Sequence, residues 1–322
     1  MARAKEQNVS WHELADFWTK RFHDDMGKLN WIIPTNYLKA SEQINSMINL
    51  IAQLLNNGLA YKVQGNIFLD ITNFPQYGKL SHLSEKEMLK IAKEFDEDLD
   101  NPFKKHRLDI TLWRASTPNQ AKHIPSFDSP FGMGRPGWHI ECSAMAISSL
   151  GQQIDIHGGG QDLKFPHHES EVIQSEGATG KIPFAKYWLH TGEVRYKGGK
   201  MSKSLGNLVL ISDLLKKYSP NAIRWMLLSH HYRSSWEFTE GEMEKAQENV
   251  NFIEEYIKNF QEGNLKNKED SLSQKEFEVY MNNDLDTPSV LSYILKSARN
   301  GLENSQRISS ILQILGFRLP TS

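Results

Sequence analysis

The stretch that most constrains the fold runs from residue 154 to residue 171, where an apolar run leads through glycines into a histidine-rich segment. Four apolar residues predict a strand: Ile147, Leu150, Ile154 and Ile156. Gly158, Gly159 and Gly160 follow, and glycine lets a backbone turn with positive φ or approach a ligand closely. Asp162 lies just beyond and offers an acceptor for a ribose hydroxyl or an amine. A strand, a glycine turn and a helix start form a natural nucleotide pocket, although a glycine triplet alone is usually only a turn.

Three residues around this stretch are candidate metal ligands. His167 and Glu171 are four residues apart, and if Pro166 opens a helix their side chains share one face. Cys142 lies upstream, and a strand and a loop could return it beside them. Sulfur, imidazole and carboxylate are all zinc ligands. The alternative is that Cys142 is a small buried hydrophobe and His167 a packed residue at a helix start.

A lysine-rich loop follows two glycines, Gly198 and Gly199, and its residues are Lys200, Met201, Ser202, Lys203 and Ser204. Two lysines three residues apart on a glycine-flanked loop can neutralise charge that develops on a transferring phosphate. The alternative is an ordinary surface loop, which seldom carries this five-residue order.

Together these motifs resemble a known family. Residues 200–204 resemble the second signature of class I aminoacyl-tRNA synthetases, and residues 138–142 and 158–171 resemble its cysteinyl branch. A related enzyme joins cysteine to an aminosugar in mycothiol synthesis. The resemblance runs through nearly the whole chain. It implies an α/β fold: a Rossmann-like nucleotide-binding domain with a connective insertion and a C-terminal helical bundle.

The resemblance also implies roles for the candidate residues. Cys142, His167 and Glu171 would hold Zn²⁺, which takes the thiolate of the substrate cysteine, and Trp138 would line the amino-acid pocket. The residues implied to bind ATP, with Mg²⁺ as its companion, are Gly158, Gly159, Asp162, Lys200, Met201, Ser202, Lys203 and Ser204. Lys200 and Lys203 would be the catalytic cations.

The implied activity is that of a cysteine–tRNA ligase. ATP would activate L-cysteine to cysteinyl-adenylate, and the cysteinyl group would pass to tRNA(Cys). Two alternatives stay open: ligation of cysteine to an aminosugar, and an inactive fragment or binding module. A carboxylate at Glu171 favours the tRNA branch over the aminosugar branch.

The sequence departs from the family in one respect. Class I synthetases carry a His-x-Gly-His signature after the first strand, and this sequence contains no such tetrapeptide. The family places a second zinc-binding cysteine on the same segment, whereas Cys142 is the single cysteine here. We therefore expect that the first nucleotide-binding half-unit is missing and that the chain has little activity unless a separate chain supplies that half.

We expect five parts along the chain: 1–31, a residual helix of the first nucleotide-binding half; 32–130, the connective insertion; 131–207, the second half with the zinc-like site and lysine loop; 208–240, stem-contact helices; and 241–322, a helical bundle. The pattern predicts helices over 8–28, from about 41 to 57, 211–218, 222–230 and 239–260, with two more ending near 299 and 315.

Other local expectations concern strands, loops and aromatic residues. We expect a hairpin around Gln64-Gly65-Asn66, and sheet elements at 187–190 and 193–196. The aromatic residues of the first helix, Phe17, Trp18 and Phe22, should lie in the core. The acidic segment 85–105 should be a solvated face or loop, and 109–114 should return the chain to the main sheet. Residues 118–136 should form an irregular loop, and His190 either faces the pocket or is packed.

Net charge and cysteine content limit which partners and which cellular compartment the sequence fits. The formal net charge is −2, so there is no global basic field and tRNA must be met by local patches. A single cysteine excludes an internal disulfide and fits a reducing cytosol. The first residues are charged rather than signal-like, and no apolar run reaches the length of a membrane span. We therefore expect a cytoplasmic protein.

Overall fold

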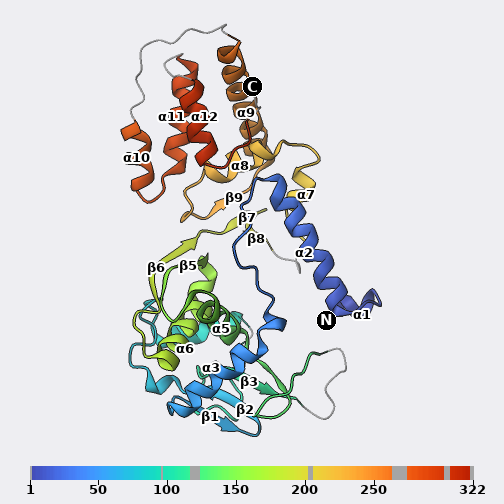
Figure 1. Cartoon of the computed structure of the whole chain (residues 1–322), viewed down its shortest axis with the longest axis vertical. Helices are drawn as coiled ribbons and strands as arrows, with labels where there is room; N and C mark the ends of the chain where they lie inside the picture. The colour runs from blue at the N-terminus through green and yellow to red at the C-terminus, as the bar shows by residue number, and fades with distance from the viewer. Residues whose placement is uncertain are drawn as a thin grey trace. The chain divides into compact units, whose positions relative to one another are not determined.

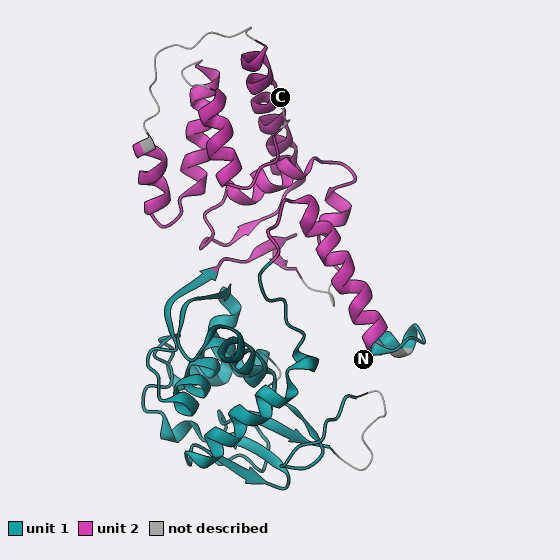
Figure 2. Cartoon of the chain, in the orientation of Figure 1, with its two compact units in different colours: residues 1–11, 34–190 teal, residues 12–33, 191–322 magenta. Residues whose placement is uncertain are grey.

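The computed structural model describes residues 2–95, 97–116, 124–201, 206–262, 274–300 and 305–319. Figure 1 shows the chain from N- to C-terminus. It divides into two compact units, residues 1–11 with 34–190 and residues 12–33 with 191–322 (Figure 2). Each unit is described below by itself. The predicted division into five parts stays a prediction.

The first unit contains a four-stranded antiparallel sheet in the order β1-β2-β3-β4. Its strands are β1 (Ala60–Val63), β2 (Asn66–Leu69), β3 (Ile110–Ala115) and β4 (Gly134–Pro136). The loop of the predicted hairpin is confirmed: Gln64 and Gly65 both have positive φ, as a two-residue hairpin loop of this kind requires. The expectation for 109–114 was wrong in part, because β3 pairs within this sheet and not with the strands of the glycine segment.

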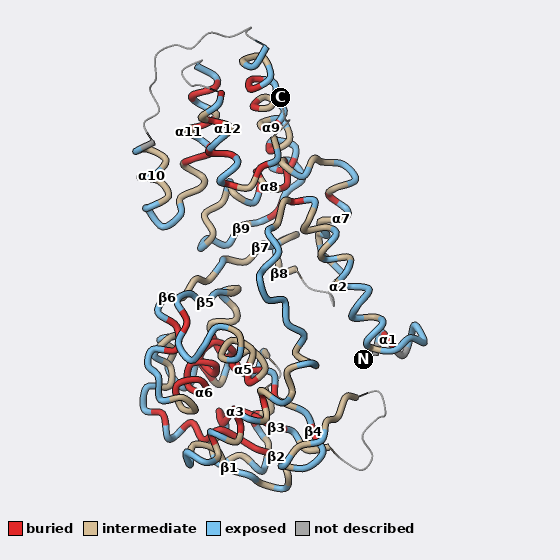
Figure 3. The backbone as a smooth tube through the Cα atoms, in the orientation of Figure 1, coloured by how far each residue is buried: buried red, intermediate tan, exposed pale blue. Residues whose placement is uncertain are grey.

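Helix α3 (Ile44–Asn56) covers this part of the unit, after a short turn η1 (Ala40–Glu42). Its buried residues recur at helical spacing: Met47, Leu50, Ile51 and Leu54. They join a core with Ile67, Leu69, Leu112, Trp113, Ile140 and Ile173. Figure 3 shows these buried stretches gathered between α3, α5 and α6. The helix ends where predicted, because Gly58 has a φ of +71° and cannot continue it.

The glycine segment forms the rest of the first unit. In chain order it comprises α5 (Trp138–Leu150), β5 (Ile154–Gly160), the turns η3 (Gln161–Leu163) and η4 (Lys164–His168), α6 (Glu169–Thr179) and β6 (Ala185–Thr191). Strands β5 and β6 form a two-stranded sheet, and the chain between them crosses over through α6. Helix α5 packs against both α3 and α6.

Two expectations for this segment are corrected. Ile147 and Leu150 belong to helix α5 and not to the strand, so α5 carries Cys142 toward the site. The three glycines end strand β5 and none of them has positive φ. Their small size is needed for packing instead: a Cβ on Gly159 would lie 2.9 Å from the His168 ring.

Helix α6 is buried from Glu169 through Glu176, and the loop 78–81 binds two of its carboxylates, those of Glu169 and Glu176. The Gly78 and Ser81 backbone N–H groups donate to the Glu169 carboxylate at 3.0 and 2.7 Å. Lys79 forms an ion pair of 2.6 Å with Glu176. Since α6 also carries a candidate ligand, these bonds fix that ligand's backbone.

The acidic segment was expected to be a solvated face or loop, and its first half is helix α4 (Glu85–Glu94), in which only Met88 and Ala92 are buried. A capping box explains this helix: Ser84 caps its start, and Glu87 accepts a hydrogen bond of 2.8 Å from the Ser84 backbone N–H. Residues 118–123 of the predicted irregular loop lie outside the described residues. Within 124–133 the chain forms only a β-bridge, between Phe127 and Gly134.

The second unit is mainly helical. Helices α8 (Pro220–Leu228), α9 (Glu240–Gln261), α11 (Thr287–Arg299) and α12 (Ser305–Ile314) pack together around one core, and lie side by side in Figure 1. Ser219, Thr239 and Asp286 cap α8, α9 and α11 with side-chain oxygens. A small sheet in the order β8-β7-β9 contains β7 (Val194–Tyr196), β8 (Gly199–Lys200) and β9 (Trp236–Glu237). Helix α7 is short, Ile211–Leu214, and α10 spans Gln274–Asn282.

Helix α2 (Trp11–Lys28) confirms the helix predicted from the periodicity. The prediction that its aromatic residues lie in the core was wrong. None of its residues is buried, and Phe17 and Phe22 are 59% and 44% exposed. Periodicity identifies an apolar face without identifying what covers it. A further short helix, α1 (Ala2–Glu6), precedes it. No described helix combines the length and apolar character that a bilayer span requires.

Candidate metal centre and nucleotide loop

The three predicted ligands come together inside the first unit. Cys142 lies on α5, His167 in the turn η4 and Glu171 on the first turn of α6. One ligand atom from each lies within 4.8 Å of the other two. The predicted shared face of His167 and Glu171 is confirmed, because His167 Nε2 lies 3.2 Å from Glu171 Oε1. A sulfur, an imidazole nitrogen and a carboxylate oxygen at this spacing form a zinc-type donor set.

The Glu171 carboxylate shows that these residues fit a cation. Its side chain is fully buried, and neither oxygen has a hydrogen-bond partner within the described part of the chain. The His157 and His167 rings approach it at 3.4 and 3.2 Å but do not meet hydrogen-bond geometry. A buried carboxylate without such bonds is costly unless a positive charge compensates it, and a divalent ion at this position would supply that charge.

Burial sets the protonation of the other two ligands. Burial, with the neighbouring His139 and His157, lowers the pKa of His167 to about 3, so its imidazole is neutral, the form that ligates metal. Burial, followed by the Glu171 and Glu141 charges, raises the pKa of Cys142 to about 12. A bound cation would reverse the thiol's shift, because a coordinating thiol is deprotonated.

A hydrogen-bonded relay orients His167 from behind. Glu97 Oε1 lies 2.9 Å from His139 Nε2, and His139 Nδ1 lies 2.8 Å from His167 Nδ1. When Glu97 accepts from His139 Nε2–H, His139 Nδ1 can accept from His167 Nδ1–H. His167 Nε2 then keeps its lone pair toward Cys142 and Glu171. A carboxylate that accepts through a neighbouring ring in this way fixes the tautomer and orientation of a metal-binding histidine.

Sequence reasoning missed this relay. The only sequence signals are that His139 adjoins Trp138 and that Glu97 lies in the acidic segment, which was interpreted as a solvated face or loop.

A second histidine group overlaps the first. His157, His168 and Glu171 also place ligand atoms within 4.8 Å of one another, and His168 Nδ1 lies 2.9 Å from His190 Nε2. His190, whose orientation the sequence left open, therefore joins this group. Burial lowers the pKa of His168 to about 3, with contributions from the neighbouring histidines. His157 and His168 were not predicted as site residues.

Trp138 lies at the rim of the metal group. Its ring stacks on His167 at a centroid distance of 4.5 Å and an angle of 22°, and the residue is 45% exposed. An exposed aromatic ring beside a metal ligand provides an apolar wall for a bound small molecule. This position suits the predicted contact with the substrate amino acid, which stays a prediction.

The predicted ATP contacts fall in both units. Gly158 and Gly159 end β5, and Asp162 lies in the turn η3. In the second unit Lys200 ends β8 and lies 3.6 Å from Glu193, while Met201 packs against the helical core. Ser202, Lys203 and Ser204 lie outside the described residues.

Both the fold and the sequence place the chain among the synthetases. In fold it is similar to a Mycobacterium tuberculosis methionyl-tRNA synthetase in complex with methionyl-adenylate, with a TM-score of 0.60 and 13% identity over 98% of this chain and 77% of that one. This is the fold of a class I aminoacyl-tRNA synthetase. The chain belongs to the class I (C) tRNA synthetase catalytic domain family, whose model matches residues 1–248.

Two relatives have named activities. A cysteine–tRNA ligase of Legionella pneumophila (strain Corby) is 41% identical over 98% of this chain and 69% of its own length. An L-cysteine:1D-myo-inositol 2-amino-2-deoxy-alpha-D-glucopyranoside ligase of Streptosporangium roseum is 43% identical over 77% of this chain and 60% of its own length.

Proposed function

We propose that this chain carries the cysteine-activating and tRNA-binding parts of a cysteine–tRNA ligase. ATP would react with the L-cysteine carboxylate to give cysteinyl-adenylate and pyrophosphate, and the cysteinyl group would then pass to a terminal ribose hydroxyl of tRNA(Cys). The observation that carries the proposal is the triad of Cys142, His167 and Glu171, in which His167 and Glu171 are buried and Cys142 is half-buried. Family membership and the 41% identity to a cysteine–tRNA ligase support it.

Cys142, His167 and Glu171 would hold one zinc ion and leave a position for the substrate. Bound zinc would supply selectivity, because it binds a thiolate well and a neutral hydroxyl poorly. The orphaned Glu171 carboxylate and the neutral His167 support this assignment. Glu97 and His139 would keep His167 in its ligating tautomer, and the exposed face of Trp138 would cover the cysteine.

The chemistry requires no covalent protein nucleophile. The cysteine carboxylate attacks the α-phosphate, and the protein's work is to position both groups and to neutralise charge on the phosphates. Gly158, Gly159 and Asp162 would approach the nucleotide, and Lys200 and Lys203 would bring their charges to its phosphates, with Mg²⁺ bound to ATP. The overlap with synthetase folds that hold aminoacyl-adenylates supports the use of ATP.

Cysteine-dependent ATP–pyrophosphate exchange tests activation, and acceptor choice tests the second step. Activation by this chain alone is expected to be weak, and we expect the cysteine that is activated to pass to tRNA(Cys) and not to an aminosugar. The alternative is a ligase that joins cysteine to an aminosugar. A relative with that activity matches 77% of this chain, so both acceptors are assayed. The 98% match to a tRNA ligase favours the first assignment. Efficient transfer to the aminosugar with none to tRNA would overturn it.

A further inference from the structure

The two oxygens of the Glu171 carboxylate face two different sets of ligand atoms. Oε1 lies 3.2 Å from His167 Nε2, a member of the candidate zinc triad. Oε2 lies 3.4 Å from His157 Nε2, a member of the second histidine group. A carboxylate that presents one oxygen to each of two ligand groups has the form of a bridge between two cations, which lie about 3.5–4 Å apart in the two-metal sites of enzymes.

An ion in the triad compensates only one of these oxygens. The Glu171 side chain is fully buried, and among the residues that the structure describes no hydrogen-bond donor reaches either oxygen. An ion beside Cys142 and His167 would satisfy Oε1. Oε2 would still face the His157 ring without hydrogen-bond geometry, and a buried acceptor that lacks a partner is costly. A second cation at Oε2 would remove this cost.

The second histidine group contains a complete set of donors for such a cation. His157 on β5, His168 in the turn η4 and Glu171 on α6 each place one ligand atom within 4.8 Å of the other two. Two imidazoles and a carboxylate hold zinc in catalytic sites that keep a further position open. The Trp188 ring packs against both histidines, at centroid distances of 4.8 and 5.3 Å, and so restricts their rotation.

His168 also has the same outer support as the triad histidine. His167 Nδ1 lies 2.8 Å from His139 Nδ1, and His168 Nδ1 lies 2.9 Å from His190 Nε2. When His168 Nδ1–H donates to His190, the His168 Nε2 lone pair is available to a metal ion. An outer partner on the other ring nitrogen is what fixes the tautomer of a metal-binding histidine.

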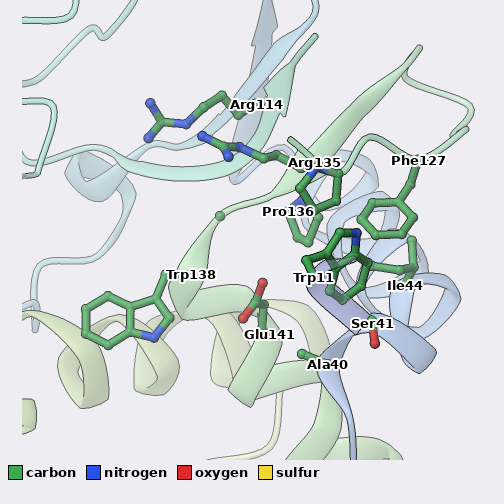
Figure 4. Close-up of a pocket in the computed structure, with 12 residues that line it drawn as sticks. Trp11, Ala40, Ser41, Ile44, Arg114, Phe127, Arg135, Pro136, Trp138 and Glu141 are labelled. Atoms are coloured by element: carbon green, nitrogen blue, oxygen red, sulfur yellow. The ribbon is translucent and has the colours of Figure 1, made fainter. Parts of the chain in front are cut away.

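Solvent can reach both groups, as a metal site requires. The His157 side chain is 16% exposed. On the triad side, Trp138 stacks on His167 and also lines a cavity of about 430 Å³, together with Glu141 (Figure 4). Two divalent ions carry more positive charge than one thiolate and one carboxylate neutralise. Because metal-bound water ionises readily, hydroxide in the open positions would balance the remainder.

We propose that the first unit binds two divalent transition-metal ions, one in the triad and one between His157 and His168, with Glu171 as the bridge. The triad ion belongs to the proposed function, and the second ion goes beyond it. The donors of the second position suit a borderline cation such as Zn²⁺ or Co²⁺. Since only the triad offers a thiolate, which these ions favour, the first equivalent fills the triad and the second fills the histidine pair.

Titration of the metal-free full chain with Co²⁺ tests the second position. Cobalt bound to a thiolate has a sulfur-to-metal charge-transfer band, whereas cobalt bound to imidazole and carboxylate has none, so absorption distinguishes the two ions. Equilibrium dialysis counts the bound metal. We expect a charge-transfer band that saturates with the first equivalent, followed by a second equivalent that leaves the band unchanged. Magnetic coupling through the carboxylate should weaken the cobalt EPR signal as the second equivalent binds.

Three variants assign the ions to their ligands. His157→Gln should lose the second equivalent and keep the first with its charge-transfer band, and this band also shows that the variant is folded. Cys142→Ala should lose the band and keep an ion at the histidine pair. The matched control is His12→Gln, which removes an exposed histidine from α2 and should bind both equivalents as the unmodified chain does.

A single bound equivalent in the unmodified chain would overturn the proposal, and so would a second equivalent that His157→Gln leaves in place. A second equivalent without magnetic coupling would contradict the bridging role of Glu171. The titration contains no cysteine, ATP or RNA and requires no turnover. Failure of cysteine activation would therefore contradict the proposed function and leave the metal count standing.

Discussion

Glu171 is the residue on which the site depends most. It is fully buried, and its oxygens face two histidine groups instead of hydrogen-bond donors. Burial in such a place is costly for any charge, and the proposed metal ion would offset this cost. Around it, His167 is already neutral and able to bind a metal ion, whereas Cys142 would release its proton on binding one.

The relay behind His167 gives a prediction at this scale. Glu97→Gln removes the charge that holds His139 in its bonded tautomer, and second-shell changes of this type typically weaken metal affinity about 10- to 100-fold. Competition with a chromogenic chelator measures the zinc affinity directly. The matched control is Glu94→Gln, an exposed glutamate on the same segment, which should leave affinity unchanged. Equal affinities for the two variants would exclude the relay.

The sequence predicted the three candidate ligands but not the residues that surround and orient them. A sulfur, an imidazole and a carboxylate predict a metal site because these are the donor types that zinc binds, and the structure brings the three side chains together. His139, His157, His168 and Glu97 were missed because their roles arise only when helix α5 and the turn η4 bring them together. Nothing in the sequence distinguishes Glu97 from the other acidic residues of its segment, so its contact with His139 could not be predicted.

Among the elements, the end of strand β5 carries the tightest packing near the site. A Cβ on Gly159 would lie 2.9 Å from His168 Cε1 and 3.1 Å from Leu163 Cδ1. His168 is buried and bonded to His190, so it cannot move aside freely. The glycines thus hold the strand against the histidine group, and the turn expected there from sequence is absent.

Gly159→Ala should therefore destabilise the first unit by about 1–3 kcal/mol, the usual cost of overpacking. Gly27→Ala is the control, because nothing lies within 4 Å of a Cβ there and alanine within helix α2 should stabilise by up to about 1 kcal/mol. Urea unfolding measures both. A Gly159→Ala chain as stable as the parent would show that the packing is loose.

Side-chain hydrogen bonds to Asp284 stabilise the turn between α10 and α11. Arg233 and Tyr232 donate to its carboxylate at 2.5 and 2.7 Å, and these bonds lower its pKa to about 2. A lowered folded-state pKa stabilises the fold above the unfolded value of 3.8, and the stabilisation is lost as pH falls toward 2.

Asp284→Asn should lower the melting temperature at pH 7, and the difference from the parent should close between pH 4 and pH 2. Asparagine tolerates the positive φ of this position, so the change isolates the charge. Asp24→Asn, which breaks only an exposed pair with Lys20, should have little effect at any pH. A difference that is constant with pH would assign the effect to shape instead.

Elements with strong local signals were predicted well. The hairpin loop at Gln64-Gly65 and the helix expected over 239–260 depend on a few adjacent residues, a turn pair in one case and a capping threonine in the other. Helix α5 was missed at Ile147 and Leu150 because a short apolar run does not distinguish a strand from a buried helix. The exposure of α2 was missed because its periodicity says nothing of neighbouring elements.

At the scale of the whole molecule, the candidate metal group lies in one compact unit, while the described lysine-loop residues and the helical core lie in the other. The family membership and the fold follow from the order of motifs along the chain, which is why the sequence predicted both.

The missing His-x-Gly-His signature gives a prediction for the whole chain. That signature contributes contacts to ATP by family resemblance, so this chain alone should show little or no cysteine-dependent ATP–pyrophosphate exchange. Exchange by the isolated chain at a rate typical of the family would refute the prediction, while zinc content measured in parallel shows that the site itself is intact.

Zinc K-edge X-ray absorption of the zinc-loaded chain, recorded with and without L-cysteine, tests the metal assignment most directly. We predict one sulfur neighbour at about 2.3 Å from Cys142 together with nitrogen and oxygen neighbours, and two sulfur neighbours after L-cysteine is added, with no such change for L-serine. A zinc shell without sulfur, or a shell that L-cysteine leaves unaltered, would contradict the account.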